Sequence, residues 1–133
     1  MLDLTNLITA SGRYPERLNS EELTLDVKSN LIDLAKRVNN LLHALKIDKI
    51  AVTSGFRPST VNAKIGGAKK SLHMMGKACD LADKDGKLKE TIVHNSHLLL
   101  EYGLWMENGK STIGWCHLDT GIRSFRPVRV FNP

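Results

Sequence analysis

The chain has only two cysteines among its 133 residues, Cys79 and Cys116, which is too few for a disulfide framework. Each cysteine stands directly before a residue with a metal-binding side chain, Asp80 or His117. Neighbouring side chains on a strand point to opposite faces of the sheet. We therefore expect both thiols to face away from Asp80 and His117 and to pack as small apolar groups in the core.

The sequence also lacks long apolar runs and a secretory signal. No run approaches the roughly 18 apolar residues that cross a bilayer. Residues 1–17 lack the basic-then-apolar layout of a signal peptide. We therefore expect a protein that is made in the cytoplasm without a signal peptide, does not insert into membranes, and reaches any outside target by another route.

Internal repeats and low-complexity segments are missing as well, and the length suits a single domain, residues 1–133, with one core. The net charge of +5 favours an anionic partner, such as nucleic acid or an acidic polymer like the bacterial cell wall. The basic residues are scattered, however, which is equally typical of a solvated surface. No helix-turn-helix or aromatic RNA-binding signature is present, so specific nucleic-acid binding is not expected.

Apolar periodicity predicts one long amphipathic helix over about residues 21–45, capped by Ser20. Shorter helices are expected at 59–63 and 88–101, the latter closed by Gly103, and strands at 49–54, 77–82, 104–107 and 114–119. Residues 1–20 form an arm with a short helix over 4–8. The basic tail, residues 120–133, is expected to be an edge strand or a surface arm. The predicted class is α+β, with a core at about 21–119 and a small central antiparallel sheet packed by helices.

Three side chains in this pattern suit one metal ion: His73 at the end of a glycine-containing loop, Asp80 on the next strand, and His117 on a late strand. Two imidazoles and one carboxylate are the usual protein share of a catalytic zinc site, which keeps a fourth position for water. Gly76 allows the chain to turn between the first two ligands. Ala78 lies two residues before Asp80, where a small side chain leaves room for metal and substrate. If the three side chains converge, the sequence predicts a zinc hydrolase.

With these features the sequence resembles the zinc D-alanyl-D-alanine peptidases. That family includes D,D-carboxypeptidases, D,D-dipeptidases and bacteriophage L-alanyl-D-glutamate endopeptidases, and its fold is shared by the Hedgehog signalling domain. The resemblance covers about residues 23–119. It rests on four motifs: Ser54, Gly55, Phe56 and Arg57; Asn62, Gly66 and Gly67; Ser71, His73, Gly76, Ala78 and Asp80; and Trp115 with His117.

The resemblance implies a role for each matched residue. His73, Asp80 and His117 would bind Zn²⁺, the expected cofactor. Arg57 would stabilise the polarised carbonyl oxygen or bind a substrate carboxylate, and Ser71 would hold its loop or contact the substrate.

The sequence departs from the family at the general base. Many members carry an acidic residue three positions before the last histidine, where this chain has Gly114. If residues 104–107 pair antiparallel with 114–117, Glu107 lies opposite Gly114 and replaces the missing carboxylate. We therefore predict Glu107 as the catalytic base, with Asp119 and Glu101 as alternatives.

Two functions follow from these observations. The first is a zinc metallopeptidase, a D,D-carboxypeptidase or endopeptidase, that cleaves peptidoglycan stem or cross-link peptides as a phage or prophage lytic enzyme. Such an enzyme acts at the bacterial cell wall after release by lysis or as part of a virion, and is monomeric unless virion-associated. The alternative is a non-catalytic, zinc-stabilised structural or recognition domain of the same fold, which Gly114 favours.

Overall fold

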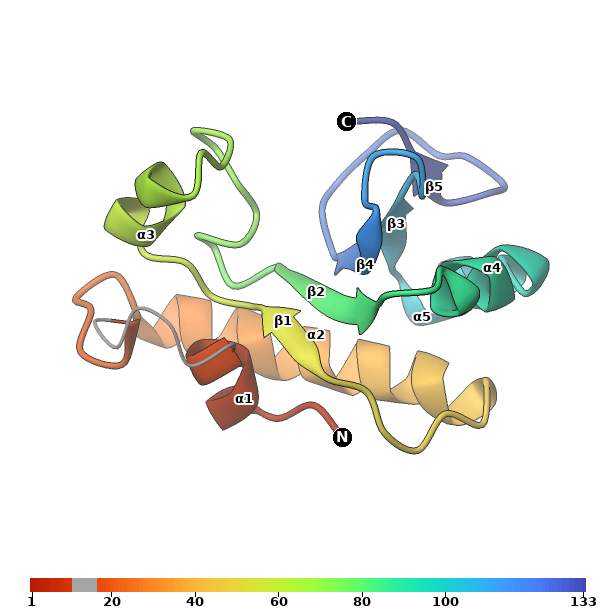
Figure 1. Ribbon diagram of the computed structural model, residues 1–133. Coiled ribbons are helices and arrows are strands. Elements are labelled where there is room, and N and C mark those ends of the chain that lie inside the picture. The colour runs from red at the N-terminus through yellow and green to blue at the C-terminus, as the bar shows by residue number, and fades with distance from the viewer. Residues whose placement is uncertain (11–16) are drawn as a thin grey trace.

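The computed structural model describes residues 1–10 and 17–133. These residues form helices that pack against one five-stranded sheet (Figure 1). The elements in chain order are α1 Leu4–Thr9, α2 Leu25–Ala44, β1 Val52–Ser54, α3 Ser59–Lys64, β2 Ala78–Asp83, α4 Lys87–His94, α5 His97–Tyr102, β3 Trp105–Glu107, β4 Gly114–Asp119 and β5 Val130–Phe131. The predicted α+β class is confirmed.

The sheet has the strand order β1-β2-β4-β3-β5. The first four strands in this order pair antiparallel, as predicted, whereas β5 runs parallel to β3 at the edge. The sheet is therefore mixed. The tail does supply an edge strand: after a loop that follows β4, residues 130–131 pair with the outer side of β3 (Figure 1).

Helix α2 carries the predicted apolar stripe and supplies much of the core. Six of its residues are buried: Leu31, Leu34, Ala35, Val38, Leu41 and Leu42. The helix begins later than predicted because Thr24, rather than Ser20, caps it by accepting a hydrogen bond from the Val27 amide at 3.2 Å. Glu22 lies before the helix and accepts hydrogen bonds from the Ser59 amide and hydroxyl, which ties this segment to α3.

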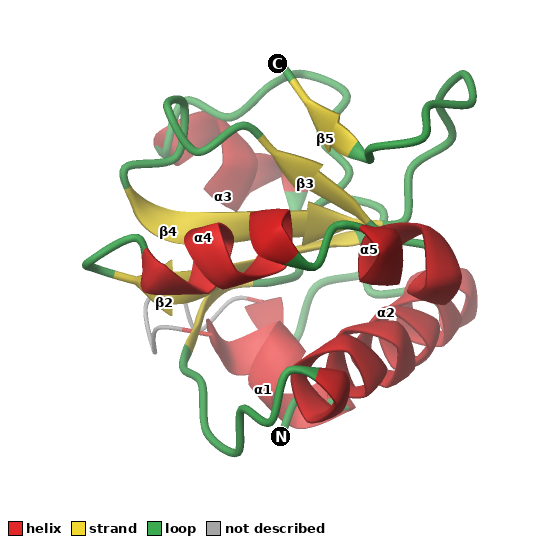
Figure 2. Ribbon diagram, turned by 90° about the vertical axis from the view of Figure 1, so that its right-hand side faces the viewer, coloured by secondary structure: helices red, strands yellow, loops and turns green. Residues whose placement is uncertain are grey.

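The helix predicted over 88–101 divides into α4 and α5, which lie end to end in Figure 2. The Asn95 side chain donates to the Thr91 carbonyl at 2.9 Å, and the Asn95 backbone leaves helical geometry. Asparagine interrupts helices in this way because its amide competes for backbone partners. Gly103 closes α5 in the left-handed conformation, as expected.

The N-terminal segment is part of the core. Leu2, Leu7 and Ile8 are buried, and the Leu2 backbone exchanges two hydrogen bonds with the Asn39 side chain. Residues 2–10 therefore belong to the packed core and not to the extended arm predicted for residues 1–20, of which 11–16 lie outside the described residues. None of the described helices is long and apolar enough to cross a membrane.

Both cysteines are fully buried and free, as predicted. They lie on the core face of β2 and β4, among Leu81 and Leu118. Burial raises the pKa of each thiol, so both stay protonated and apolar.

Candidate metal centre

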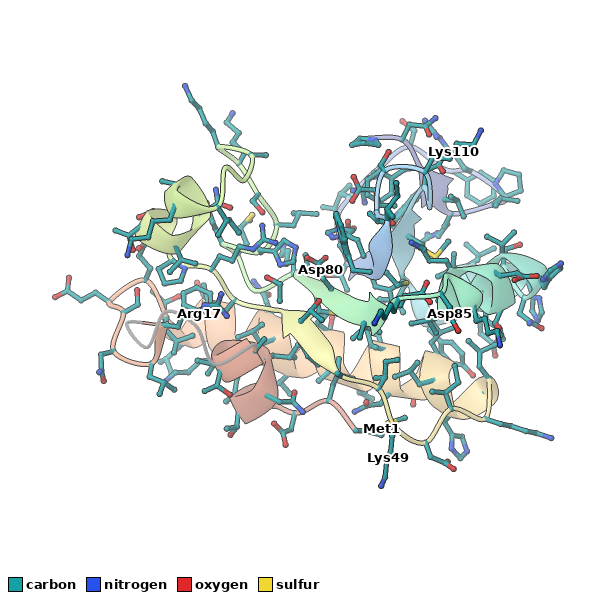
Figure 3. All side chains as sticks on the ribbon, viewed as in Figure 1. Met1, Arg17, Lys49, Asp80, Asp85 and Lys110 are labelled. Atoms are coloured by element: carbon teal, nitrogen blue, oxygen red, sulfur yellow. The ribbon has the colours of Figure 1, made fainter. Side chains whose placement is uncertain are left out.

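The pairing of β2 with β4 brings two of the predicted ligands side by side. Asp80 is directly opposite His117 in this antiparallel register, so their side chains share one face of the sheet. Asp80 lies where β2 passes between the chain that follows α3 and strand β4 (Figure 3). The third ligand, His73, approaches from the loop before β2. The structure thus brings together all three residues that the sequence predicted.

The three side chains meet at one oxygen of Asp80. His117 Nδ1 lies 2.9 Å from Asp80 Oδ1, and His73 Nε2 lies 3.4 Å from the same atom. One ligand atom from each residue falls within 4.8 Å of the others. The two imidazole rings are 5.3 Å apart, edge to face.

The other nitrogen of each imidazole is already engaged. His73 Nδ1 lies 2.8 Å from the Gly55 carbonyl, and His117 Nε2 lies 2.8 Å from Asp119 Oδ2. A carbonyl or a carboxylate accepts the ring N–H, so the nitrogen that points toward Asp80 keeps its lone pair when the ring is neutral. Metal-ligating histidines are oriented by such outer contacts.

This arrangement fits zinc. Zinc bonds to imidazole nitrogen and carboxylate oxygen of about 2.0–2.2 Å place neighbouring ligand atoms about 3.3–3.6 Å apart around a tetrahedral ion. The distance from His73 Nε2 to Asp80 Oδ1 is in this range, and the one from His117 Nδ1 is shorter by a few tenths of an ångström. All three ligand atoms lie within 4.8 Å of one another, so His73, Asp80 and His117 would hold a zinc ion once these atoms close to the tetrahedral spacing.

The protonation states of His73 and Asp80 support the same conclusion, whereas His117 must first give up a proton to bind the metal. Burial lowers the pKa of His73 despite the opposing Asp80 charge, which favours the neutral, metal-binding imidazole. Burial alone would raise the pKa of Asp80, but both histidines together lower it, so the carboxylate stays ionised. For His117, burial is outweighed by hydrogen bonds to Asp119 and Asp80, which raise its pKa to about 9.

The model of the peptidase M15 family matches residues 13–118, which is most of the chain and includes all three ligands. The chain belongs to the peptidase M15 family. Peptidases of this family are zinc-dependent. None of the curated proteins compared matches the chain.

Arg57 of this M15 peptidase contacts the metal-binding group directly. Its Nη2 donates to Asp80 Oδ2 at 3.2 Å, and its Nε donates to Ser54 Oγ at 3.0 Å. Burial lowers the pKa of Arg57 and the Asp80 charge opposes this shift, so the guanidinium stays charged. Arg57 therefore holds the second oxygen of Asp80, in addition to any role toward the substrate.

Ser71 holds the loop that carries His73. Its hydroxyl accepts a hydrogen bond from the His73 amide at 3.2 Å. This contact accounts for one of the two roles predicted for Ser71, and contact with the substrate stays a prediction.

Two glycines of the motifs allow backbone to approach backbone behind the site. A Cβ on Gly55 would lie 2.0 Å from the Leu7 carbonyl oxygen, which accepts the Phe56 amide. Gly76 has a φ of +71°, and a Cβ there would lie 2.6 Å from the Val27 carbonyl oxygen. Helices α1 and α2 thereby support the two segments that carry the Gly55 carbonyl and the His73 ring.

The predicted pairing of Glu107 with Gly114 is wrong. In the structure Gly114 pairs with Asp83, and β3 pairs with the far end of β4, where Trp105 is opposite Asp119 and Met106 opposite Leu118. The register differs because strand β3 must bury Met106 in the core beside Leu118.

Glu107 nevertheless lies on the side of β3 that the site occupies. It alternates with Met106, which points into the core, and so shares the face of Trp105. Continuing the register by one residue brings Glu107 level with His117. Its side chain is half-buried. Glu107 as the base therefore remains a prediction, now supported by a different register.

The two alternative bases differ in their surroundings. Asp119 is fully buried, and its oxygens are engaged by His117, Arg123 and the Gly121 amide. These hydrogen bonds outweigh the effect of burial and lower the pKa of Asp119. Glu101 is exposed on α5, which packs against α2 and β3.

The contact of Asp119 with His117 was missed from the sequence. A carboxylate two residues after a ligand on the same strand shares its face, and this alternation was the available signal. Arg123, which binds Asp119, gave no comparable signal, because the course of the tail depends on tertiary packing.

Proposed function

We propose that this M15 protein is a zinc-dependent peptidase that cleaves peptidoglycan stem or cross-link peptides. The observation that carries the proposal is the convergence of His73, Asp80 and His117, with oriented rings, in a chain of the peptidase M15 family. A positive net charge is in keeping with attraction to an anionic cell wall.

The residues around the ligands have complementary roles in amide hydrolysis. Zinc, when bound, polarises the scissile carbonyl and makes water a stronger nucleophile. Arg57 carries a fixed positive charge beside Asp80, where it stabilises negative charge that develops on the substrate oxygen. Glu107 removes a proton from the attacking water and delivers a proton to the leaving amine.

We extend the proposal to a phage or prophage lytic enzyme that acts at the bacterial cell wall. Asn62, Gly66 and Gly67 match a pattern typical of the small phage and bacterial branch that the sequence resembles. In the structure, Asn62 organises this turn: its side chain donates to the Ala68 carbonyl at 2.7 Å, and its carbonyl accepts the Gly67 amide. A virion or a lysis system would then be its partner.

The test is digestion of purified peptidoglycan by the zinc-loaded protein, followed by mass spectrometry of the released fragments. We expect new free amines and a shortened stem peptide, whose masses identify the bond and distinguish carboxypeptidase from endopeptidase cleavage. The His73→Ala variant serves as the control.

The competing function is a non-catalytic zinc domain, favoured by Gly114 at the position where many relatives carry an acid. Zinc would then contribute only to folding. Stoichiometric zinc binding without cleavage of any stem peptide would support this alternative and overturn the peptidase.

A further inference from the structure

We propose that Asp119 and Arg123 are positioning residues for His117. The C-terminal segment 119–131 would then orient one of the metal ligands. The inference rests on the proposed zinc-dependent function and deepens it. It concerns a segment that lies entirely beyond the M15 match, which ends at residue 118.

Asp119 fixes which nitrogen of His117 faces the metal. Its Oδ2 lies 2.8 Å from His117 Nε2, and the side chain is fully buried. An ionised carboxylate only accepts hydrogen bonds. His117 must therefore carry its proton on Nε2 when it is neutral, which leaves the Nδ1 lone pair directed at Asp80 and at the metal position.

Arg123 in turn holds Asp119 through both oxygens. Nη1 donates to Oδ1 at 2.6 Å and Nη2 donates to Oδ2 at 3.1 Å, which is the two-pronged geometry typical of arginine and carboxylate. The Gly121 amide donates to Oδ1 at 3.0 Å. Each carboxylate oxygen thus accepts two hydrogen bonds. These contacts hold the carboxylate in its orientation toward His117.

The position of Arg123 is set by aromatic rings from strands β3 and β5. Its guanidinium lies 3.7 Å from the centre of the Phe131 ring and 5.3 Å from that of Trp105. The Phe131 ring also packs edge to face against His117, with 6.0 Å between centres. Phe131 belongs to β5, so pairing of β5 with β3 closes this set of contacts over the outer side of His117.

A role as general base is less compatible with these contacts. Asp119 is completely buried, and both oxygens already accept strong hydrogen bonds. A base must reach the water that it deprotonates. Asp119 therefore acts through His117 rather than on the substrate.

The test compares zinc affinities of full-length variants by competition with a chelator. We expect Asp119→Asn to bind zinc about 10- to 100-fold more weakly, the usual effect of losing such an outer contact. The asparagine amide keeps the shape of the side chain but can donate to Nε2, which shifts the ring proton to Nδ1 and blocks that ligand atom.

Two Arg123 variants and a matched control complete the series. Arg123→Ala should weaken zinc binding by a smaller factor than Asp119→Asn, and Arg123→Lys should restore part of it. Arg126→Ala removes an exposed arginine of the same segment and should leave the affinity unchanged. Circular dichroism of the metal-free variants checks folding.

A second measurement does not depend on any variant. Nitrogen-15 NMR of the histidine rings in the zinc-loaded wild type should show His117 with zinc on Nδ1 and a proton on Nε2. Zinc on Nε2, or Asp119→Asn binding within about twofold of the wild type, would overturn the positioning role while leaving the zinc peptidase intact. A wild type that binds no zinc would overturn the proposed function itself.

Discussion

Asp80 is the residue on which the site depends. One of its oxygens faces both histidines, and the other accepts from Arg57, so four charged or polar side chains share a nearly buried position. Buried charges persist only where partners compensate them. In the metal-free protein those partners are Arg57 and the protonated His117, and zinc would take over the role of His117 by displacing its proton.

Competition between zinc and this proton predicts the pH dependence of metal binding. Because the pKa of His117 is raised to about 9, zinc must release a proton from it at any lower pH. The apparent zinc affinity should therefore fall as the pH decreases below about 9, by up to about tenfold per pH unit. Chelator competition at several pH values measures this slope, and an affinity that is flat from about pH 6 to about pH 8 would contradict the assignment.

Glu107 and His73 should separate turnover from metal binding. Glu107→Ala should reduce the peptidase rate by about 10²- to 10⁴-fold, the usual contribution of a general base, and leave zinc bound. His73→Ala should lose both zinc and activity, because it removes a ligand. Rates on stem peptides together with zinc content measure the two effects.

Glu90→Ala is the matched control for this pair, since Glu90 is an exposed acid on α4. It should keep wild-type activity. Full activity in Glu107→Ala would remove Glu107 from the mechanism.

At the scale of elements, the loop before β2 places His73 through backbone contacts with its neighbours. The Arg57 amide donates to the His73 carbonyl, and Gly76 lies against α2 at the end of the loop. The position of His73 therefore depends on the contact between this loop and α2 as well as on the loop sequence.

A non-glycine residue in the left-handed conformation costs about 1–2 kcal/mol. Gly76→Ala should lower the free energy of unfolding by more than this amount. An added Cβ meets the Val27 carbonyl at 2.6 Å, which forces the loop and α2 apart. Chemical denaturation measures the loss in the free energy of unfolding.

Gly86→Ala is the control for backbone strain, because Gly86 has a similar φ of +76° with nothing within 4 Å of an added Cβ. Equal losses in the two variants would show that the contact with α2 contributes nothing.

For the whole molecule, the three ligands connect segments that are distant in the chain. A zinc ion would join the loop after α3, strand β2 and strand β4 at one point. A ligand that binds only the folded state stabilises it by mass action. Metal binding should therefore be visible in the stability of the entire domain.

Zinc at 100 times its dissociation constant should add about 2.7 kcal/mol to the free energy of unfolding. For a domain of this size the melting temperature should rise by roughly 10 °C. Calorimetry with zinc or with a chelator measures the shift. His73→Ala should abolish it, whereas His94→Ala, which changes an exposed histidine on α4, should preserve it. An undiminished shift in His73→Ala would place the metal elsewhere.

The sequence alone determined the long helix, most strands and the ligand set, because apolar periodicity and short motifs express local chemistry. The stripe of α2 and the face shared by Ala78 and Asp80 needed only the periods of helix and strand. Tertiary structure decided the register of β3 on β4, the parallel β5, the burial of α1, and the contacts of Asp119 with His117 and Arg123. These features depend on long-range pairing, in which burying Met106 beside Leu118 outweighs any preference that a single segment carries.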